Sequence, residues 1–332
     1  MRTSGGGSPP DRPFPAPAPW PKRLDALTAI GMIFLGVILG FPKDGRGAPE
    51  DQPLRAVVLI SQNIRPYIEA ADRAAETLQG GGLQVETIQV ETLPADEKQL
   101  LEQAIDRNAY DLLLTVGPEA SRFAWSRSRT GACPVIYTMV LNPERLPDAP
   151  ADPCGISLGI PIEVQMQSIT RILPSVKRIG LMFDPGNNAW FHETAERIAA
   201  AKGLSVTPIR LSSRKEISRA LEAVWGKIDG LWLVPDRTII SESIVQYLIK
   251  QALLNDTPVV GYNRFFYESG AAISFVFDYG KLGEQAGRLA IERVQGRECG
   301  HPAPAFKTWI NTRVLEKLEI PLGDGGGSVI LK

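Results

Sequence analysis

The chain has 332 residues, of which 44% are hydrophobic and 22% charged, and this composition fits a globular protein of two domains. A formal net charge of −1 and the lack of a long basic run argue against a nucleic-acid partner. Two histidines (His192, His301) and three cysteines (Cys133, Cys154, Cys299) are too few and too scattered for a zinc site, so no metal is expected.

The amino terminus departs from this average. Residues 1–21 are rich in Gly and Pro and are expected to be disordered. Two basic residues then precede the uncharged run ALTAIGMIFLGVILGF (26–41), which suits the core of an export signal and is short for a membrane span. The small residues Gly45, Gly47 and Ala48 follow, where a signal peptidase would cut. Residues 1–48 are therefore predicted to be a disordered segment plus a signal peptide or membrane anchor; a cleaved signal is favoured, and a buried core helix is the alternative.

From residue 54 onward, short apolar runs alternate with longer amphipathic ones. Strands are expected at 55–61, 83–90, 111–117, 134–140 and 155–160, and helices at 65–79 and 95–107. Strands that alternate with helices form right-handed crossovers, which give a parallel sheet covered on both faces.

The same plan then restarts. The runs at 178–184, 204–211, 229–236 and 258–263 correspond in order and spacing to four of the strands in the first half. The fold class is therefore predicted to be α/β, with two doubly wound parallel-sheet domains joined by a hinge.

An exported protein meets an oxidising environment, which permits disulfides. Cys133 and Cys154 lie 21 residues apart, and each stands just before a strand-like run. If those strands are neighbours, the two sulfurs meet, and the bridge adds about 3 kcal/mol. A Cys133–Cys154 disulfide is one expectation, and two free buried thiols are the other.

Ligands of open parallel sheets lie beyond the carboxyl ends of the strands. Six such ends carry hydroxyl, amide or carboxylate groups, or Gly with open backbone amides, and if they face each other they enclose a cleft. The candidate ligand-binding residues at or near these ends are Ser61, Gln62, Thr115, Gly117, Thr138, Asn142, Asp184, Asn187, Asn188, Trp190, Asp236, Tyr262 and Asn263.

Several catalytic signatures are missing from the sequence. It contains no Walker A loop, no G-x-G-x-x-G after the first strand and no G-x-S-x-G elbow. His192 is expected at the surface or the rim of the cleft rather than as a base. Asp184 and Asp236 form a possible carboxylate pair, for which binding or a turn is favoured over acid–base work. A binding protein without a cofactor is therefore favoured over an enzyme.

The stretch GISLGIPIEVQMQSITRILPSVKRIGLMFDPGNN (155–188), together with PVVGYN (258–263) and GAAISFVFDYGKLGEQAGRLA (270–290), resembles the substrate-binding proteins of ABC transporters. The similar group includes bacterial tryptophan and tyrosine binders, and the likeness covers residues 54–322. It implies a type I periplasmic-binding-protein fold. The first lobe would comprise 54–160 and 275–297, the second 161–273 and 298–322, and 323–332 would be a flexible tail.

The resemblance also implies an amino-acid ligand, whose carboxylate would sit on backbone amides at helix starts. Thr115, Gly117, Asn187 and Asn188 suit that role, and Asp236 or Asp278 would take the amino group. The loops VGPEAS (116–121) and MVLNPE (139–144) depart from the usual family pattern. Arg65 and Arg122 either face the cleft or are solvated helix charges.

Four aromatic residues allow different interpretations. Trp232 lies inside a strand and is expected in the core, and Trp125 is expected to pack rather than to bind. The sequence equally supports two positions for Tyr262, one lining the cleft and one packed against other side chains. Trp190 is a candidate stacking wall, where burying a ligand group would contribute about 1–3 kcal/mol.

The predicted function is that of an extracytoplasmic, monomeric solute-binding component of an ABC importer. It would capture a small molecule, an amino acid or related carboxylate, by hinge closure and deliver it to a permease in the inner membrane. A membrane-anchored ligand sensor is the first alternative, and an enzyme that uses Asp184 and Asp236 is the second.

Overall fold

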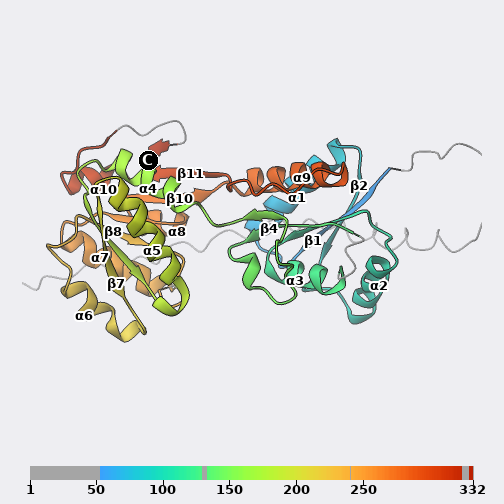
Figure 1. Cartoon of the computed structure of the whole chain (residues 1–332), viewed down its shortest axis with the longest axis horizontal. Helices are drawn as coiled ribbons and strands as arrows, with labels where there is room; N and C mark the ends of the chain where they lie inside the picture. Colours follow the sequence, from blue (N-terminus) through green and yellow to red (C-terminus); the bar gives the residue numbers. More distant parts are fainter. Residues whose placement is uncertain (1–52, 129–132, 240, 324–328, 332) are drawn as a thin grey trace, which may run out of the picture. The chain divides into compact units, whose positions relative to one another are not determined.

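The computed structural model describes residues 53–128, 133–239, 241–323 and 329–331. These residues build two sheets with helices on both faces (Figure 1), which we call the first and the second lobe. The apolar run at 26–41 lies outside the described residues, so its export role stays a prediction. Within the described part, no helix combines the length and the apolar character that crossing a bilayer requires.

The first lobe is a parallel sheet in the order β2-β1-β3-β4-β5. Its strands are β1 (Arg55–Ile60), β2 (Gln84–Gln89), β3 (Leu112–Val116), β4 (Val135–Val140) and β5 (Gly155–Ser157). Helices α1 (Arg65–Gly80) and α9 (Tyr279–Val294) pack on one face, and α2 (Ala95–Asp106) and α3 (Pro118–Arg127) on the other.

The second lobe has the order β12-β11-β10-β9-β8-β6-β7. Its strands are β6 (Arg178–Phe183), β7 (Ser205–Arg210), β8 (Gly230–Leu233), β9 (Val259–Gly261), β10 (Ile273–Phe277), β11 (Phe306–Ile310) and β12 (Val329–Leu331). One face carries α4 (Ile162–Ile172), α5 (Pro185–Ala201) and α10 (Thr312–Lys317). The other carries α6 (Ile217–Glu222), α7 (Glu242–Leu254) and α8 (Arg264–Glu268). Short 3-10 turns lie at η1 (Pro143–Arg145) and η2 (Arg214–Glu216).

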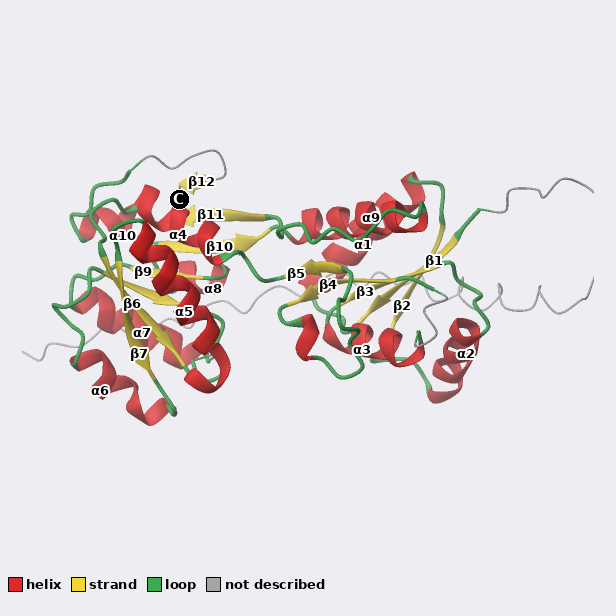
Figure 2. Ribbon diagram, viewed as in Figure 1, coloured by secondary structure: helices red, strands yellow, loops and turns green. Residues whose placement is uncertain are grey.

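Helices cover both faces of each sheet (Figure 2), and the alternation of side chains along the strands explains this layering. Leu181 and Phe183 of β6 enter the core under α4 and α5, whereas Met182 between them enters the core under α6 and α7. Successive side chains of a strand point to opposite faces, so a strand that is apolar at every position needs cover on both. The predicted pair of doubly wound parallel sheets is confirmed.

The return of the chain to the first lobe lies slightly later than expected. β10 pairs antiparallel with β11 as far as Phe277 and Phe306, so it belongs to the second sheet, not to the segment assigned from 275 onward to the first lobe. Helix α9, which follows β10, packs on the first lobe against α1. Gly283 and Gly287 permit this close approach, because a Cβ atom at either position would collide with Ala70 or Thr77 of α1.

Three segments cross between the two sheets in the described part of the chain: the stretch after β5, Asp278, and the stretch between α9 and β11. Two of them run side by side, since the Asp278 amide donates to the Ala305 carbonyl at 3.1 Å. The expectation that 323–332 is a flexible tail is also wrong in part. β12 lies within it and pairs with β11 from Thr308 to Ile310.

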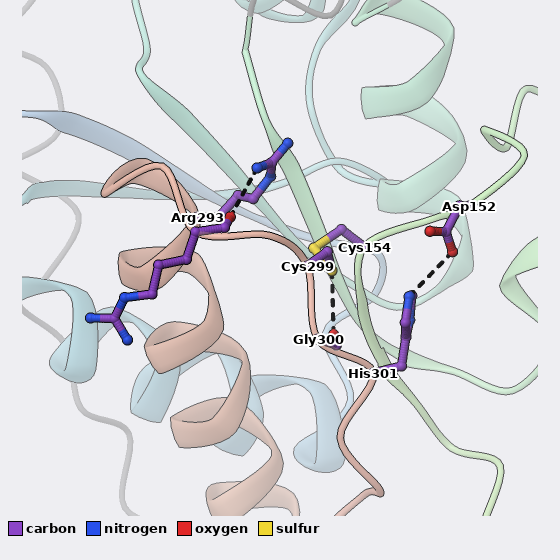
Figure 3. The surroundings of a disulfide bond; sticks show 7 residues. Asp152, Cys154, Arg293, Cys299, Gly300 and His301 are labelled. Carbon is purple, nitrogen blue, oxygen red and sulfur yellow. Dashed lines mark hydrogen bonds and ion pairs between the residues drawn. A yellow bond between two sulfur atoms is a disulfide. The ribbon is translucent and has the colours of Figure 1, made fainter.

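The expected Cys133–Cys154 disulfide is wrong. Cys154 is bonded to Cys299, 145 residues away, with their Cα atoms 5.7 Å apart (Figure 3). Cys133 is a buried free thiol. The bond ties the chain just before β5 to the chain just after α9, so 298–299 lies with the first lobe rather than the second. Beside it, His301 pairs with Asp152 at 3.2 Å.

Candidate functional site

A cavity of about 570 Å³ is lined by residues that follow the strands of both sheets. From the first lobe it takes the start of α1 and the segments after β4 and β5. From the second lobe it takes the start of α5 and the segments after β8 and β9, and Phe277 and Tyr279 close it at the crossing between β10 and α9. The carboxyl ends of parallel strands share one edge of each sheet, which explains why residues so distant in sequence line one space.

Aromatic side chains dominate this lining: Tyr67, Trp190, Phe191, Tyr262, Phe277 and Tyr279. The Trp190 indole is 50% exposed although it is a large apolar group, and it meets Phe191 edge to face with ring centroids 5.6 Å apart. Burial raises the pKa of the Tyr67, Tyr262 and Tyr279 phenols, so they stay neutral at physiological pH. The cavity therefore offers π faces together with neutral hydroxyl donors.

Polar groups are interspersed among the rings: Asn142, Glu144, Ser157, Gln165, Asn188 and Asn263. Several are already oriented by the protein. Gln165 donates to the Ile160 carbonyl at 2.8 Å, and the Ser157 hydroxyl donates to the Leu141 carbonyl at 2.9 Å. Asn263 caps α8 by accepting from the Phe266 amide at 3.1 Å. Among these described lining residues, Glu144 is the single side chain that carries a formal charge.

Five of the predicted site residues line the cavity: Asn142, Asn188, Trp190, Tyr262 and Asn263. Tyr262, which the sequence left balanced between cleft and packing, does both, because its ring also packs on Phe266 with centroids 4.5 Å apart. The other predicted residues lie outside the lining.

The hydroxyls of Ser61 and Thr115 are engaged within the first lobe. Ser61 Oγ accepts from the Ala120 amide at 2.9 Å, and Thr115 Oγ1 shares a hydrogen bond of 2.9 Å with Ser121. Both residues are fully buried, and together they fix the start of α3 to the strand ends. Gly117 begins this helix at φ 95°, and a Cβ atom there would come within 2.6 Å of Ser61 Oγ.

Thr138 is also fully buried, and its hydroxyl has no hydrogen-bond partner among the described residues. The next residue, Met139, adopts a left-handed φ of 61° where the pairing of β4 with β5 shifts register. This irregularity turns Met139 into the cavity lining.

Asp184 and Asp236 bind the ends of β6 and β8 to each other. Asp236, 2% exposed, accepts from the Asp184 amide at 2.8 Å, from Asn188 Nδ2 at 2.7 Å and from the Thr238 amide at 2.8 Å. Asp184 accepts from the Gly186 amide, Asn187 Nδ2 and the Thr238 hydroxyl. Both carboxylates are thus satisfied by neutral donors, an arrangement that favours a turn-holding role over acid–base chemistry.

Asn188 departs from helical geometry inside α5, with φ −129° and ψ 25°. The kink directs its side chain to Asp236 and places it in the cavity lining. The preceding carbonyl, that of Asn187, accepts from Arg145 Nη2 at 3.3 Å, a contact between the second lobe and the first.

Asp278 lies at the crossing segment, where it caps α9 through the Lys281 amide and pairs with Lys307 at 2.9 Å. Burial raises the pKa of Asp278, but the hydrogen bonds from Lys307 and the Lys281 amide outweigh this and hold the pKa below its usual value. Asp278 therefore holds the crossing segment in place and does not line the cavity. Gln62 is half-buried outside the lining, and Arg65 and Arg122 are exposed outside it.

Three further aromatic expectations are resolved by burial. Trp232 is 1% exposed and packs in the second core, as expected. Trp125 packs edge to face on Tyr137, also as expected. His192 differs: it is buried, stacked on Phe183 with ring centroids 5.0 Å apart, because it lies on the inner face of α5.

Sequence reasoning missed Tyr67, Glu144, Gln165 and Tyr279. Tyr67, Gln165 and Tyr279 sit in the first turn of α1, α4 and α9, so a search restricted to the loop residues passed over them. The available signal was an aromatic or amide residue one helical turn after a strand end or crossing. Among the described residues, no cluster of three or more His, Cys, Asp or Glu side chains has the arrangement of a metal site.

Comparison with known proteins identifies a family whose model matches most of the chain. A family model described as ABC transporter substrate binding protein matches residues 75–325. A tyrosine-binding protein of Clostridioides difficile (strain R20291) is 25% identical over 198 residues, which cover 57% of this chain and 56% of that protein. The match therefore spans little more than half of the relative's length.

Two solved structures share the fold. One is an ABC domain from Streptococcus pneumonia in complex with L-Trp, at a TM-score of 0.56 and 20% identity, covering 84% of this chain and 100% of that one. The other is the ligand-free, open structure of a substrate binding protein with adhesive properties from Clostridium difficile. Its TM-score is 0.67 at 17% identity, and the match covers 84% of this chain and 99% of that one.

Proposed function

Because the chain belongs to the ABC transporter substrate-binding protein family, we propose that it is the extracytoplasmic binding component of an importer. It captures an amino acid or a related carboxylate in the cavity and delivers it to a permease in the inner membrane. The two lobes have the type I periplasmic-binding-protein architecture that the sequence led us to expect.

The observation that carries this proposal is the cavity itself. Its volume of about 570 Å³ suits a small molecule, and residues of both lobes line it. A ligand held between two lobes gains contacts with both only when they approach, so binding favours the closed arrangement. The paired crossings at Asp278 and Ala305 are the natural hinge.

The starts of the helices suggest where a carboxylate sits. α1 begins at the cavity, and its N-cap, Ile64, provides no side-chain hydrogen bond. Pro66 has no N–H and the Tyr67 amide donates to the Ile64 carbonyl at 3.0 Å, so the dipole of the helix, rather than a set of free amides, attracts an anion there. The start of α5 already holds the Asp184 carboxylate, which repels a second anion. We therefore place the ligand carboxylate at α1, and the apolar part of the ligand against Trp190 and Tyr262 of the second lobe.

A thermal-shift screen tests this function. Amino acids, small carboxylates and nucleosides are added to the full chain, and a ligand that binds the folded state raises the melting temperature. We expect at least one amino acid or carboxylate to do so. No shift with any class, on protein shown to be folded by circular dichroism, would contradict the proposal.

A further inference from the structure

The described residues that line the cavity carry a negative charge that no positive lining residue among them balances. Glu144 is an acid, and the described residues that line the cavity include no Lys, Arg or His to balance it. Its carboxylate makes no hydrogen bond or ion pair with the other described side chains. The neighbouring Arg145 is not a lining residue, and its Nη2 donates to the Asn187 carbonyl at 3.3 Å.

Glu144 is exposed, but the aromatic rings that border the same space add to its attraction for a cation. Aromatic rings attract positive charge through their faces, and Tyr67, Trp190, Tyr262 and Tyr279 all border the same space. The tyrosines remain neutral, so they add no negative charge of their own. A ligand that has a carboxylate but no ammonium group would be attracted only by the positive end of the α1 dipole, and Glu144 would repel it.

From this arrangement we infer that the ligand carries a primary amine, that Glu144 is the partner of its ammonium group, and that acids lacking an amine are rejected. The inference rests on the proposed function and narrows it to amines with an apolar body. The ammonium donates to Glu144 in the first lobe, the carboxylate, where present, meets the start of α1, and the apolar body packs on the aromatic side chains.

Three sets of matched compounds test the inference by calorimetric titration of the full chain. Each set keeps one apolar body and varies the polar groups: L-tryptophan, tryptamine and indole-3-propionate; L-phenylalanine, phenethylamine and 3-phenylpropionate; and L-leucine, isoamylamine and 4-methylpentanoate. We expect at least one amino acid to bind, and the acid of that set to bind at least about tenfold more weakly, the loss of one charged hydrogen bond.

Glu144→Gln provides the second arm, because glutamine keeps the size of the side chain and removes its charge. We expect it to weaken binding of the amine compounds about tenfold and to reduce the discrimination against the acid. Glu163→Gln, on the exposed face of α4 outside the cavity, is the matched control and leaves both unchanged.

The outcomes separate the two proposals. An amine-free acid that binds as tightly as its amine partner overturns the inference while leaving a solute-binding function intact. So does discrimination that survives Glu144→Gln, or a screen in which every compound that binds lacks an amine. If no compound of any class binds to folded protein, the proposed function itself fails.

Discussion

The Ala70 carbonyl of α1 lies directly against Gly283 of α9 and occupies the space that a Cβ atom on Gly283 would need. The contact matters for function because α9 is the helix that follows the Asp278 crossing and anchors it to the first lobe. Close approach of these two helices thus fixes the crossing segment to the first lobe.

Gly283→Ala should destabilise the protein by about 1–3 kcal/mol, since the added methyl group forces the two helices apart. Urea unfolding followed by circular dichroism measures the change. Gly280→Ala in the same helix is the control: the nearest atom to its new Cβ would be Arg73 Cγ at 3.5 Å, an ordinary contact, so we expect no loss. Equal effects of the two substitutions would contradict the packing argument.

The cysteine pairing predicts the number of reactive thiols. Protein purified without reductant and then unfolded should show one, that of Cys133, and Cys133→Ala should show none. Reducing the Cys154–Cys299 bond should lower the free energy of unfolding by about 2–5 kcal/mol. Three reactive thiols in the unreduced wild type would mean that the bond does not form.

Asp278 makes part of the stability depend on pH. Its pKa is lowered in the folded state, so its contribution is complete above the unfolded value of about 3.9 and is lost as the pH falls through the lower folded value. Asp278→Asn keeps a residue that caps helices but removes the charge that pairs with Lys307. The free energy of unfolding of this variant, measured by urea titration from pH 6 to pH 3, should fall less steeply than that of the wild type. An unchanged slope would show that the pair with Lys307 contributes nothing.

The strands were predictable because their side chains obey a simple rule. A run such as Leu112–Val116, apolar at every position except Thr115, fits a strand that is covered on both faces, and the structure buries all five residues at the centre of the first sheet. The duplicated order of such runs was enough to predict two similar sheets.

The disulfide was not predictable in the same way. Cys133 and Cys154 do precede neighbouring strands, but Cys299 reaches Cys154 only because α9 crosses back to the first lobe. That return depends on long-range packing, such as the fit of Gly283 against Ala70, which no local pattern reports.

The cavity was predictable in position but not residue by residue. The strand-end rule identified the edges of the sheets at which the cavity lies, yet a hydroxyl at such an edge either faces the cavity or bonds within its own lobe. Thr115 does the latter through Ser121, whereas Tyr67, one turn into α1, faces the cavity. Side-chain direction at these points follows from packing beneath the loop, which the sequence does not display.

The central claim, that a small molecule binds in the cavity between the lobes, is tested most directly by calorimetric titration of Trp190→Ala with the compound that gives the largest thermal shift. Trp190 is half exposed, so its loss should leave folding intact while weakening binding about tenfold or more, the value of one stacking contact. Tyr247→Ala, which removes an exposed aromatic from α7 outside the cavity, should bind like the wild type. Unchanged affinity in Trp190→Ala, or an equal loss in both variants, would contradict a binding site at this cavity.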